Sequence, residues 1–271
     1  MAATPLYFGD SNRRLYGVYH HAEIRAPRAP ACLLFNPFGE EAIRSFRILK
    51  QLAERLARSG SPVLRFDYYG SGDSEGVCGE LDFDGMVRDA ATAQEELEAL
   101  SGARRFAWIG LGLGGAVALR AASATPATLA HLFLWDAVLS GDAYLVGLRA
   151  AHVAALSQAL DTPAARIERE TPAPPEDMTE AMGFHLPDRL RAQLMDFAFA
   201  GEKRLAQQCH VITTSGRADA AACEDALTSI ASEIHHYDGD VEAWNSADAM
   251  NAYTIPSGIL NYITDIASPS A

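Results

Sequence analysis

The stretch with the most chemical information is residues 106–120, which pass from an apolar strand through several glycines into a helix of small residues. A sharp turn between a strand and a helix can hold the side chain at its centre clear of the sheet, where a hydroxyl or thiol could act as a nucleophile. The centre of this turn is Gly112, which has no side chain and can attack nothing. The sequence therefore indicates a fold more firmly than it indicates a reaction.

The same glycines allow a different interpretation, because Gly110-x-Gly112-x-x-Gly115 fits the fingerprint of a dinucleotide-binding loop. Asp136 follows Gly115 by twenty-one positions, near the spacing at which an acidic residue binds a ribose. Such a fingerprint normally opens the first strand–helix–strand unit of a domain, whereas here two strand motifs precede it. We therefore keep dinucleotide binding as a minor alternative.

Composition narrows the class of protein. The 271 residues carry a net charge of −13, which argues against nucleic acid, because phosphates require a basic surface. The charge is uneven: residues 217–271 hold one Lys or Arg against nine Asp and Glu. We interpret this acidic quarter as a solvated face or, less simply, as a contact surface for a basic protein partner. No apolar run approaches the ~18 residues of a membrane span.

Cysteine usage and the N-terminus bear on the compartment. The four cysteines, Cys32, Cys78, Cys209 and Cys223, lack CxxC spacing and predict neither a disulfide framework nor a zinc site. We interpret them as buried thiols of a reducing compartment. The N-terminal residues lack the basic start and apolar run of a signal peptide, so we expect a cytoplasmic protein. Because no motif for a metal site stands out, we also expect no metal and no cofactor.

The elements that must position the glycine turn alternate regularly. We expect strands at 6–9, 14–21, 31–35, 62–67, 105–110 and 132–136, and helices at 43–59, 83–100 and 114–122. This alternation predicts a parallel sheet with helices on both faces.

The regular alternation of strands and helices stops after residue 136. Helices are expected at 141–160 and 187–200, with a loop at 171–176, before strands return at 209–214 and 233–237 and a helix closes the chain at 253–266. About seventy residues between two strands of one sheet predict a helical cap at about 138–207.

Three motifs stand in the order expected of an α/β-hydrolase. Leu34–Glu41 resembles the loop after the third strand, and Leu64–Gly76 resembles a turn of the serine aminopeptidase and lysophospholipase-like branch. Gly110–Gly115 resembles the nucleophile elbow Gly-x-Ser-x-Gly, with Gly112 in place of the serine. The chain is most similar to the exosortase A system-associated hydrolases, on these motifs together with Leu134–Tyr144, Trp244 and Ile255-Pro256.

This resemblance covers the chain from residue 16 to residue 263. It implies a single α/β-hydrolase domain over residues 1–271, with a mainly parallel sheet of about eight strands, helices on both faces and a helical cap.

Acyl transfer by this fold needs a nucleophile, a base and an acid that orients the base. The resemblance implies Asp219 as the acid, since Gly216-x-x-Asp219 follows a predicted strand, and Asp136 is a second candidate. The base is expected at about 238–245, a stretch that contains no histidine. His235 and His236 precede it inside a predicted strand, where alternation turns only one of them toward a given face.

Other polar residues near these motifs have simpler explanations. His185, in the predicted cap, is a candidate to face the site from above. Glu40 and Glu41 suit the start of a helix, where the dipole favours negative charge. Asp73 and Ser74 are expected to brace their turn by local hydrogen bonds.

The oxyanion machinery that the resemblance implies needs no serine. The amide of Leu113, an amide near Phe38 and Gly39, and the start of the helix at 114–122 would together form a donor pocket for a carbonyl or carboxylate.

Our leading hypothesis is a hydrolase homologue without the serine mechanism that binds a small acyl, ester or peptide-like ligand. The alternative is a lyase, cyclase or water-mediated hydrolase in which Asp219, Asp136 or His185 moves a proton while the amides polarise a carbonyl. In both cases the expected partner is a small-molecule ligand or substrate, and a homodimer is left open.

Overall fold

The structure is a computed structural model that describes residues 3–24, 29–124, 129–170, 174, 177–201, 205–214, 220–237 and 255–267. It is built around an eight-stranded sheet in the order β1-β2-β4-β3-β5-β6-β9-β10. The strands are β1 (Ala3–Asp10), β2 (Arg13–His20), β3 (Ala31–Phe35), β4 (Val63–Phe66), β5 (Phe106–Leu111), β6 (Leu129–Trp135), β9 (Gln208–Thr214) and β10 (Glu233–Tyr237). β2 is antiparallel to β1 and β4, and the other pairs are parallel. The expected mixed, mainly parallel sheet is confirmed.

The central strands are buried on both faces, as the apolar runs predict. Every residue of β3, β5 and β6 is buried. β6 begins at Leu129, earlier than the predicted residue 132. The sequence did not indicate this earlier start, because His131 interrupts the apolar run. In the structure the His131 ring is buried, and its Nδ1 lies 3.2 Å from Nε2 of His210 on β9.

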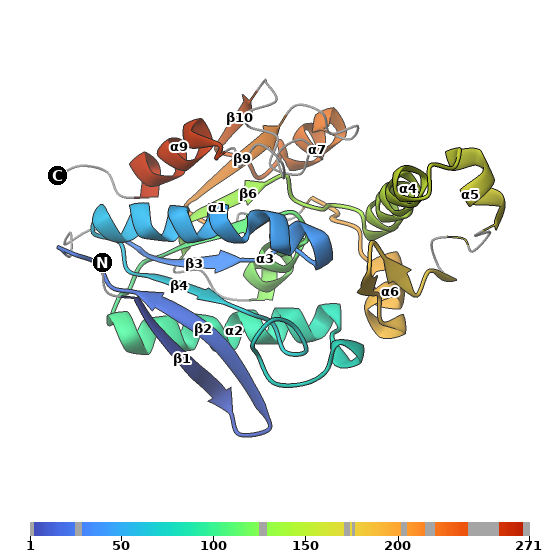
Figure 1. Ribbon diagram of the computed structural model, residues 1–271. Helices are drawn as coiled ribbons and strands as arrows, with labels where there is room; N and C mark the ends of the chain where they lie inside the picture. The colour runs from blue at the N-terminus through green and yellow to red at the C-terminus, as the bar shows by residue number, and fades with distance from the viewer. Residues whose placement is uncertain are drawn as a thin grey trace.

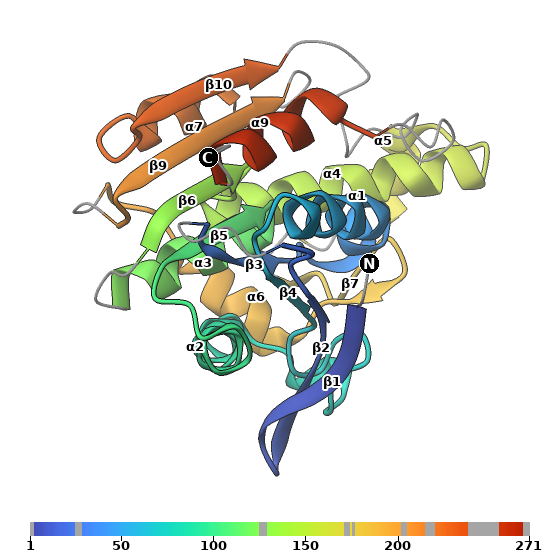
Figure 2. The same cartoon turned by 90° about the vertical axis from the view of Figure 1, so that its left-hand side faces the viewer.

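Helices cover both faces of the sheet (Figures 1 and 2). α1 (Gly39–Arg58) and α9 (Ser257–Ala267) share one hydrophobic cluster with one face, and α2 (Phe83–Ser101) and α3 (Leu113–Ala124) share another with the opposite face. Leu227 of α7 (Ala220–Leu227) belongs to the second cluster. α1 begins before the predicted residue 43, because Glu40 and Glu41 occupy its first turn, where their charge favours the helix dipole.

The segment between β6 and β9 contains α4 (Gly141–Ala159), α5 (Ala164–Glu170), β7 (Glu180–Ala181), β8 (Phe184–His185) and α6 (Asp188–Met195). Figure 1 shows these elements to one side of the sheet. The predicted helix at 187–200 is too long, because the residues after α6 form an extended stretch in which Phe199 N donates to Leu139 O. Most of the predicted loop at 171–176 lies outside the described residues.

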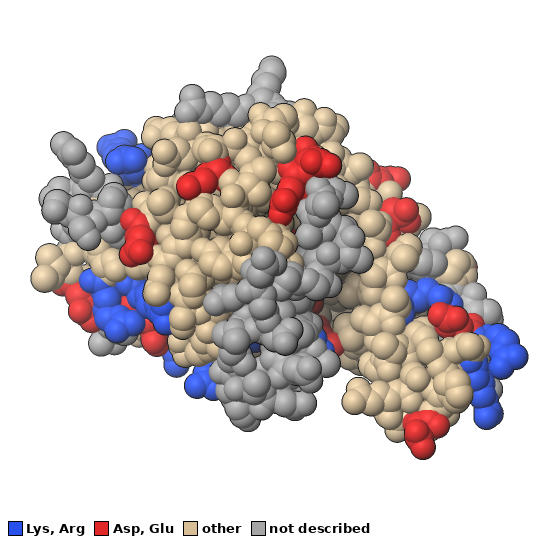
Figure 3. Space-filling view, turned by 90° about the horizontal axis from the view of Figure 1, so that it is seen from above, with Lys and Arg blue, Asp and Glu red and all other residues tan. Residues whose placement is uncertain are grey.

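The surface agrees with the acidic composition. Figure 3 shows Lys and Arg mainly toward the two ends of that face, with mostly uncharged residues and some Asp and Glu on the described surface between them. Among the described residues, no helix combines the length and the apolar character needed to cross a membrane.

Candidate functional site

The turn between β5 and α3 has the geometry that the glycines suggest. Gly112 has a φ of 56°, a left-handed conformation that side chains disfavour. Its N–H donates to Trp135 O at 3.0 Å, and its carbonyl accepts from Gly115 N at 3.0 Å and from Val138 N at 3.1 Å. The turn is therefore tied both to the first turn of α3 and to the end of β6.

The other glycines of this stretch permit close packing. A Cβ on Gly110 would lie 2.6 Å from Cα of Gly115, and a Cβ on Gly114 would collide with the carbonyl oxygens of Phe35 and Asn36. This packing accounts for the pattern Gly110-x-Gly112-x-x-Gly115 without a nucleotide. It also brings the start of α3 directly against the loop that follows β3.

Two backbone amides lie next to this contact. Phe38 precedes α1 in an extended conformation, and Leu113 is the first residue of α3. Within the described part of the chain, neither the Phe38 N–H nor the Leu113 N–H has a hydrogen-bond acceptor. Backbone amides at helix starts can polarise a carbonyl or hold a carboxylate.

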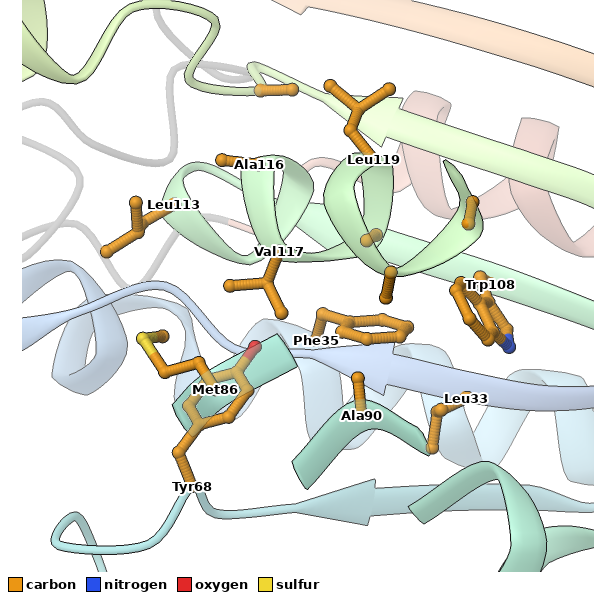
Figure 4. Packing of buried hydrophobic residues seen from close by; sticks show 14 of the residues in the cluster. Leu33, Phe35, Tyr68, Met86, Ala90, Trp108, Leu113, Ala116, Val117 and Leu119 are labelled. Atoms are coloured by element: carbon orange, nitrogen blue, oxygen red, sulfur yellow. The ribbon is translucent and has the colours of Figure 1, made fainter. Parts of the chain in front are cut away.

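A cavity of about 780 Å³ lies beside the Phe38 loop. Its wall comes from the loop after β3, the first turns of α1, the loop after β4 and the β7–β8 hairpin, and includes Phe38 and Gly39 but neither Gly112 nor Leu113. Figure 4 shows Leu113 at the same end of the core as Tyr68 and Met86, two residues of the cavity wall.

The loop after β4 is held by its own polar groups. Oδ2 of Asp67 accepts from Asp73 N at 3.0 Å, and Ser74 Oγ donates to Asp67 O at 2.6 Å while accepting from Tyr16 N at 2.8 Å. Ser74 thus braces this turn through its hydroxyl, as expected, whereas Asp73 contributes only its backbone N–H. Burial raises the pKa of the Asp67 carboxyl, and the bond from Asp73 N partly offsets that rise.

Asp136 lies at the end of β6 with only 1% of its surface exposed. Its φ of 46° is unusual for a residue with a side chain. Its Oδ1 accepts from Thr214 N at 2.9 Å and its Oδ2 accepts from Thr214 Oγ1 at 2.6 Å. These bonds join the ends of β6 and β9, and they engage both oxygens that a ribose or an imidazole would need. Asp219 lies outside the described residues.

The two strand histidines are engaged at the edge of the sheet. His235 Nε2 lies 3.0 Å from Oε1 of Glu233, and His236 Nδ1 lies 3.2 Å from Oε1 of Glu224 and 2.9 Å from Oγ1 of Thr213. The stretch 238–245, where a catalytic base was expected, is outside the described part of the chain.

His185 is exposed at the end of β8, next to Phe184 of the cavity wall. Its carbonyl oxygen lies 3.7 Å from Sγ of Cys78, which also lines the cavity. Sequence reasoning missed both Phe184 and Cys78. The expectation of four buried thiols is wrong for Cys78, which is exposed at the start of the short 3-10 helix Cys78–Glu80.

The remaining thiols are buried. Burial raises the pKa of Cys32 and that of Cys209 to about 12. Among the described residues, no three His, Cys, Asp or Glu side chains are grouped so that they could hold a metal ion.

The acidic residues at the start of α1 are paired. Arg44 Nη2 lies 2.6 Å from Oε1 of Glu40, and the Tyr144 hydroxyl of α4 donates to Oε2 of Glu41 at 3.4 Å. The first turn of α1 is therefore connected to the segment that follows β6.

The strand order and the glycine turn after β5 are those of an α/β-hydrolase fold. The sequence model of the family described as serine aminopeptidase, S33 (Hydrolase_4), matches residues 31–191, more than half of the chain. The chain belongs to this family.

Solved structures of the same fold cover nearly the whole chain. Proline iminopeptidase from Mycobacterium smegmatis superposes with a TM-score of 0.62 at 15% identity, covering 97% of each chain. A thermostable carboxyl esterase from Bacillus coagulans gives a TM-score of 0.63 at 15% identity, covering 98% of this chain and 99% of its own. A proline iminopeptidase-related protein from Thermus thermophilus gives 0.63 at 18% identity, covering 99% of each. A comparison with curated proteins found no match.

Proposed function

We propose that this chain is an α/β-hydrolase-fold protein that has lost the serine nucleophile and binds a small acyl, ester or peptide-like ligand at the former active site. The observation that carries the proposal is Gly112, at a φ of 56° between β5 and α3. In the elbow motif that this turn resembles, the same position holds the attacking serine. Without a hydroxyl there, the covalent step of a serine hydrolase has no nucleophile.

The amides of Phe38 and Leu113 support the binding part of the proposal. Oxyanion donors act on a carbonyl oxygen through fixed dipoles, and this attraction does not depend on a nucleophile. Both esterases and iminopeptidases occur among the named structural neighbours, so ester and peptide-like ligands both stay within the proposal.

We also propose that the segment at about 138–207 caps this site. Phe184 from β8 contributes to the cavity wall, and Tyr144 from α4 bonds to Glu41 at the start of α1. The motifs Leu34–Glu41, Leu64–Gly76 and Leu134–Tyr144 favour the exosortase A system-associated branch. The four free thiols favour a cytoplasmic location.

A second candidate function is catalysis without a serine, with His185 moving a proton. The link between His185 and the cavity is its backbone carbonyl, which lies 3.7 Å from Sγ of Cys78; the His185 side chain is exposed and does not line the cavity, so this candidate ranks below binding. The two functions differ in what His185→Ala changes. An enzyme would lose turnover with little change in ligand affinity, whereas a binding protein would show no turnover before or after the substitution.

Intact-mass spectrometry after treatment with a fluorophosphonate probe tests the loss of the nucleophile. We expect no adduct on the native chain or on Gly112→Ala, and one adduct on Gly112→Ser if a usable base has been retained. Gly112→Ala is the matched control, because it imposes the same backbone cost without a hydroxyl. An adduct on the native chain would show another activated nucleophile and would overturn the proposal.

A further inference from the structure

We propose that the ligand of this site carries an unbranched hydrocarbon chain, which lies in the cavity between α1 and the loop after β4. This inference rests on the proposed function, because the amides of Phe38 and Leu113 would hold the carbonyl or carboxylate end of the same ligand. It separates an acyl ligand from a peptide-like one.

The volume and lining of the cavity suit a hydrocarbon chain. The cavity measures about 780 Å³, within the range of about 300–1,000 Å³ for small-molecule sites. Its apolar wall includes Phe38, Ala42, Ile43, Phe46, Met86 and Phe184. Phe38 belongs both to this wall and to the proposed donor pair, so we place the carbonyl end of the ligand at Phe38.

Three polar residues of the wall already have partners inside the protein, whereas the side chain of Asp73 is exposed to solvent. Asn36 Nδ2 donates to Phe66 O at 2.8 Å, Ser71 Oγ donates to Tyr68 O at 2.8 Å, and Ser74 Oγ donates to Asp67 O at 2.6 Å. A peptide would bring further amide groups into the cavity, and each group without a partner would cost free energy. A hydrocarbon chain brings none.

Two apolar side chains of the cavity wall are exposed to solvent. Ile43 is 64% exposed and Phe46 is 60% exposed, although both lie on α1 beside a well-packed core. Large side chains exposed side by side on a helix often mark a binding surface. A hydrocarbon chain would cover both, and each methylene that it buries would strengthen binding by about fourfold.

Cys78 offers a direct measure of occupancy, because it is the exposed thiol of the cavity wall. The test measures how well saturated carboxylates from butanoate to decanoate protect Cys78 from iodoacetamide, with Cys78→Ser to identify the signal. We expect the concentration for half-protection to fall about fourfold per added methylene, until the cavity is full.

A matched pair of variants locates the chain. Ala42→Phe narrows the cavity, so the affinity should stop increasing at a shorter acid than in the native chain. Ala91→Phe, on the exposed face of α2, should leave the half-protection concentration of every acid unchanged. Equal protection by butanoate and decanoate, no protection by any acid, or better protection by an N-acetyl dipeptide than by octanoate would overturn the inference.

The head group distinguishes this inference from the proposed function. If octan-1-ol protects Cys78 as well as octanoate does, the hydrocarbon site is supported and the proposed role of the amide donors is wrong. If all the acids protect equally and the alcohol does not, the donors stand and the hydrocarbon inference fails.

Discussion

At the scale of single residues, Gly112 can be tested by its backbone. A side chain in the left-handed region costs about 1–2 kcal/mol, so Gly112→Ala should lower the free energy of unfolding by about that amount. Urea denaturation measures the change. Gly147→Ala is the control, because Gly147 lies inside α4 with open space around its Cα, and alanine there should stabilise the helix by about 0.5–1 kcal/mol. Equal effects of the two substitutions would contradict the assigned conformation.

Asp136 is a structural residue by its contacts, and its partner provides the test. Thr214→Val removes the hydroxyl that bonds to Oδ2 of a buried carboxylate, and it should cost about 1–3 kcal/mol of stability. Thr228→Val, at an exposed position, should change the free energy of unfolding by less than about 0.5 kcal/mol. If Thr214→Val barely changed the free energy of unfolding, the bond to Thr214 would not hold the Asp136 carboxylate, and Asp136 would be available for chemistry.

At the scale of elements, buried histidines make stability depend on pH, and burial lowers the pKa of three of them, His20, His131 and His210. Burial lowers the pKa of His20 on β2 and that of His131 on β6 to about 4, from 6.5. Both are neutral in the folded chain, so their stabilisation is complete above pH 6.5 and is lost as the pH falls toward 4. Each contributes on the order of 2–3 kcal/mol to this loss.

Urea denaturation between pH 7.5 and 4.5 measures this dependence. His131→Phe keeps an aromatic ring in the strand and removes one titrating group, so its stability should fall less steeply below pH 6.5 than that of the native chain. The same slope in both proteins would show that His131 is not buried in its neutral form.

Some of the strands could be predicted from the sequence and others could not. β3 and β10 have the predicted bounds, because their β-rich runs are local signals. The β7–β8 hairpin was missed because its strands are two residues long and depend on distant contacts, such as Met182 N donating to His152 Nδ1 at 2.9 Å. No local pattern encodes such a contact.

At the scale of the whole molecule, the four thiols report how the chain is packed. Native protein should take up one iodoacetamide rapidly, at Cys78, and four adducts should form after unfolding in urea. The buried thiols also resist alkylation because a raised pKa, as at Cys32 and Cys209, keeps them protonated. Mass spectrometry counts the adducts, and more than one on the native chain would show that the core opens.

The site as a whole was only partly predictable. The glycines and the Phe38 loop could be recognised, because each is a local motif at the end of a strand. The cavity could not be predicted, since its wall joins residues far apart in the sequence, such as Phe38, Cys78 and Phe184. The glycine-flanked position of Cys78 was the one available signal that this thiol is exposed.

A donor pocket that binds its ligand without a nucleophile would act through the backbone amides of Phe38 and Leu113. The measurement is a ¹H–¹⁵N titration of the labelled chain with hexanoate, with hexan-1-ol as the control. We predict that both amide protons move downfield along one shared saturation curve with hexanoate and stay nearly in place with the alcohol. If hexanoate binds and neither amide moves, the ligand is held elsewhere and the account is wrong.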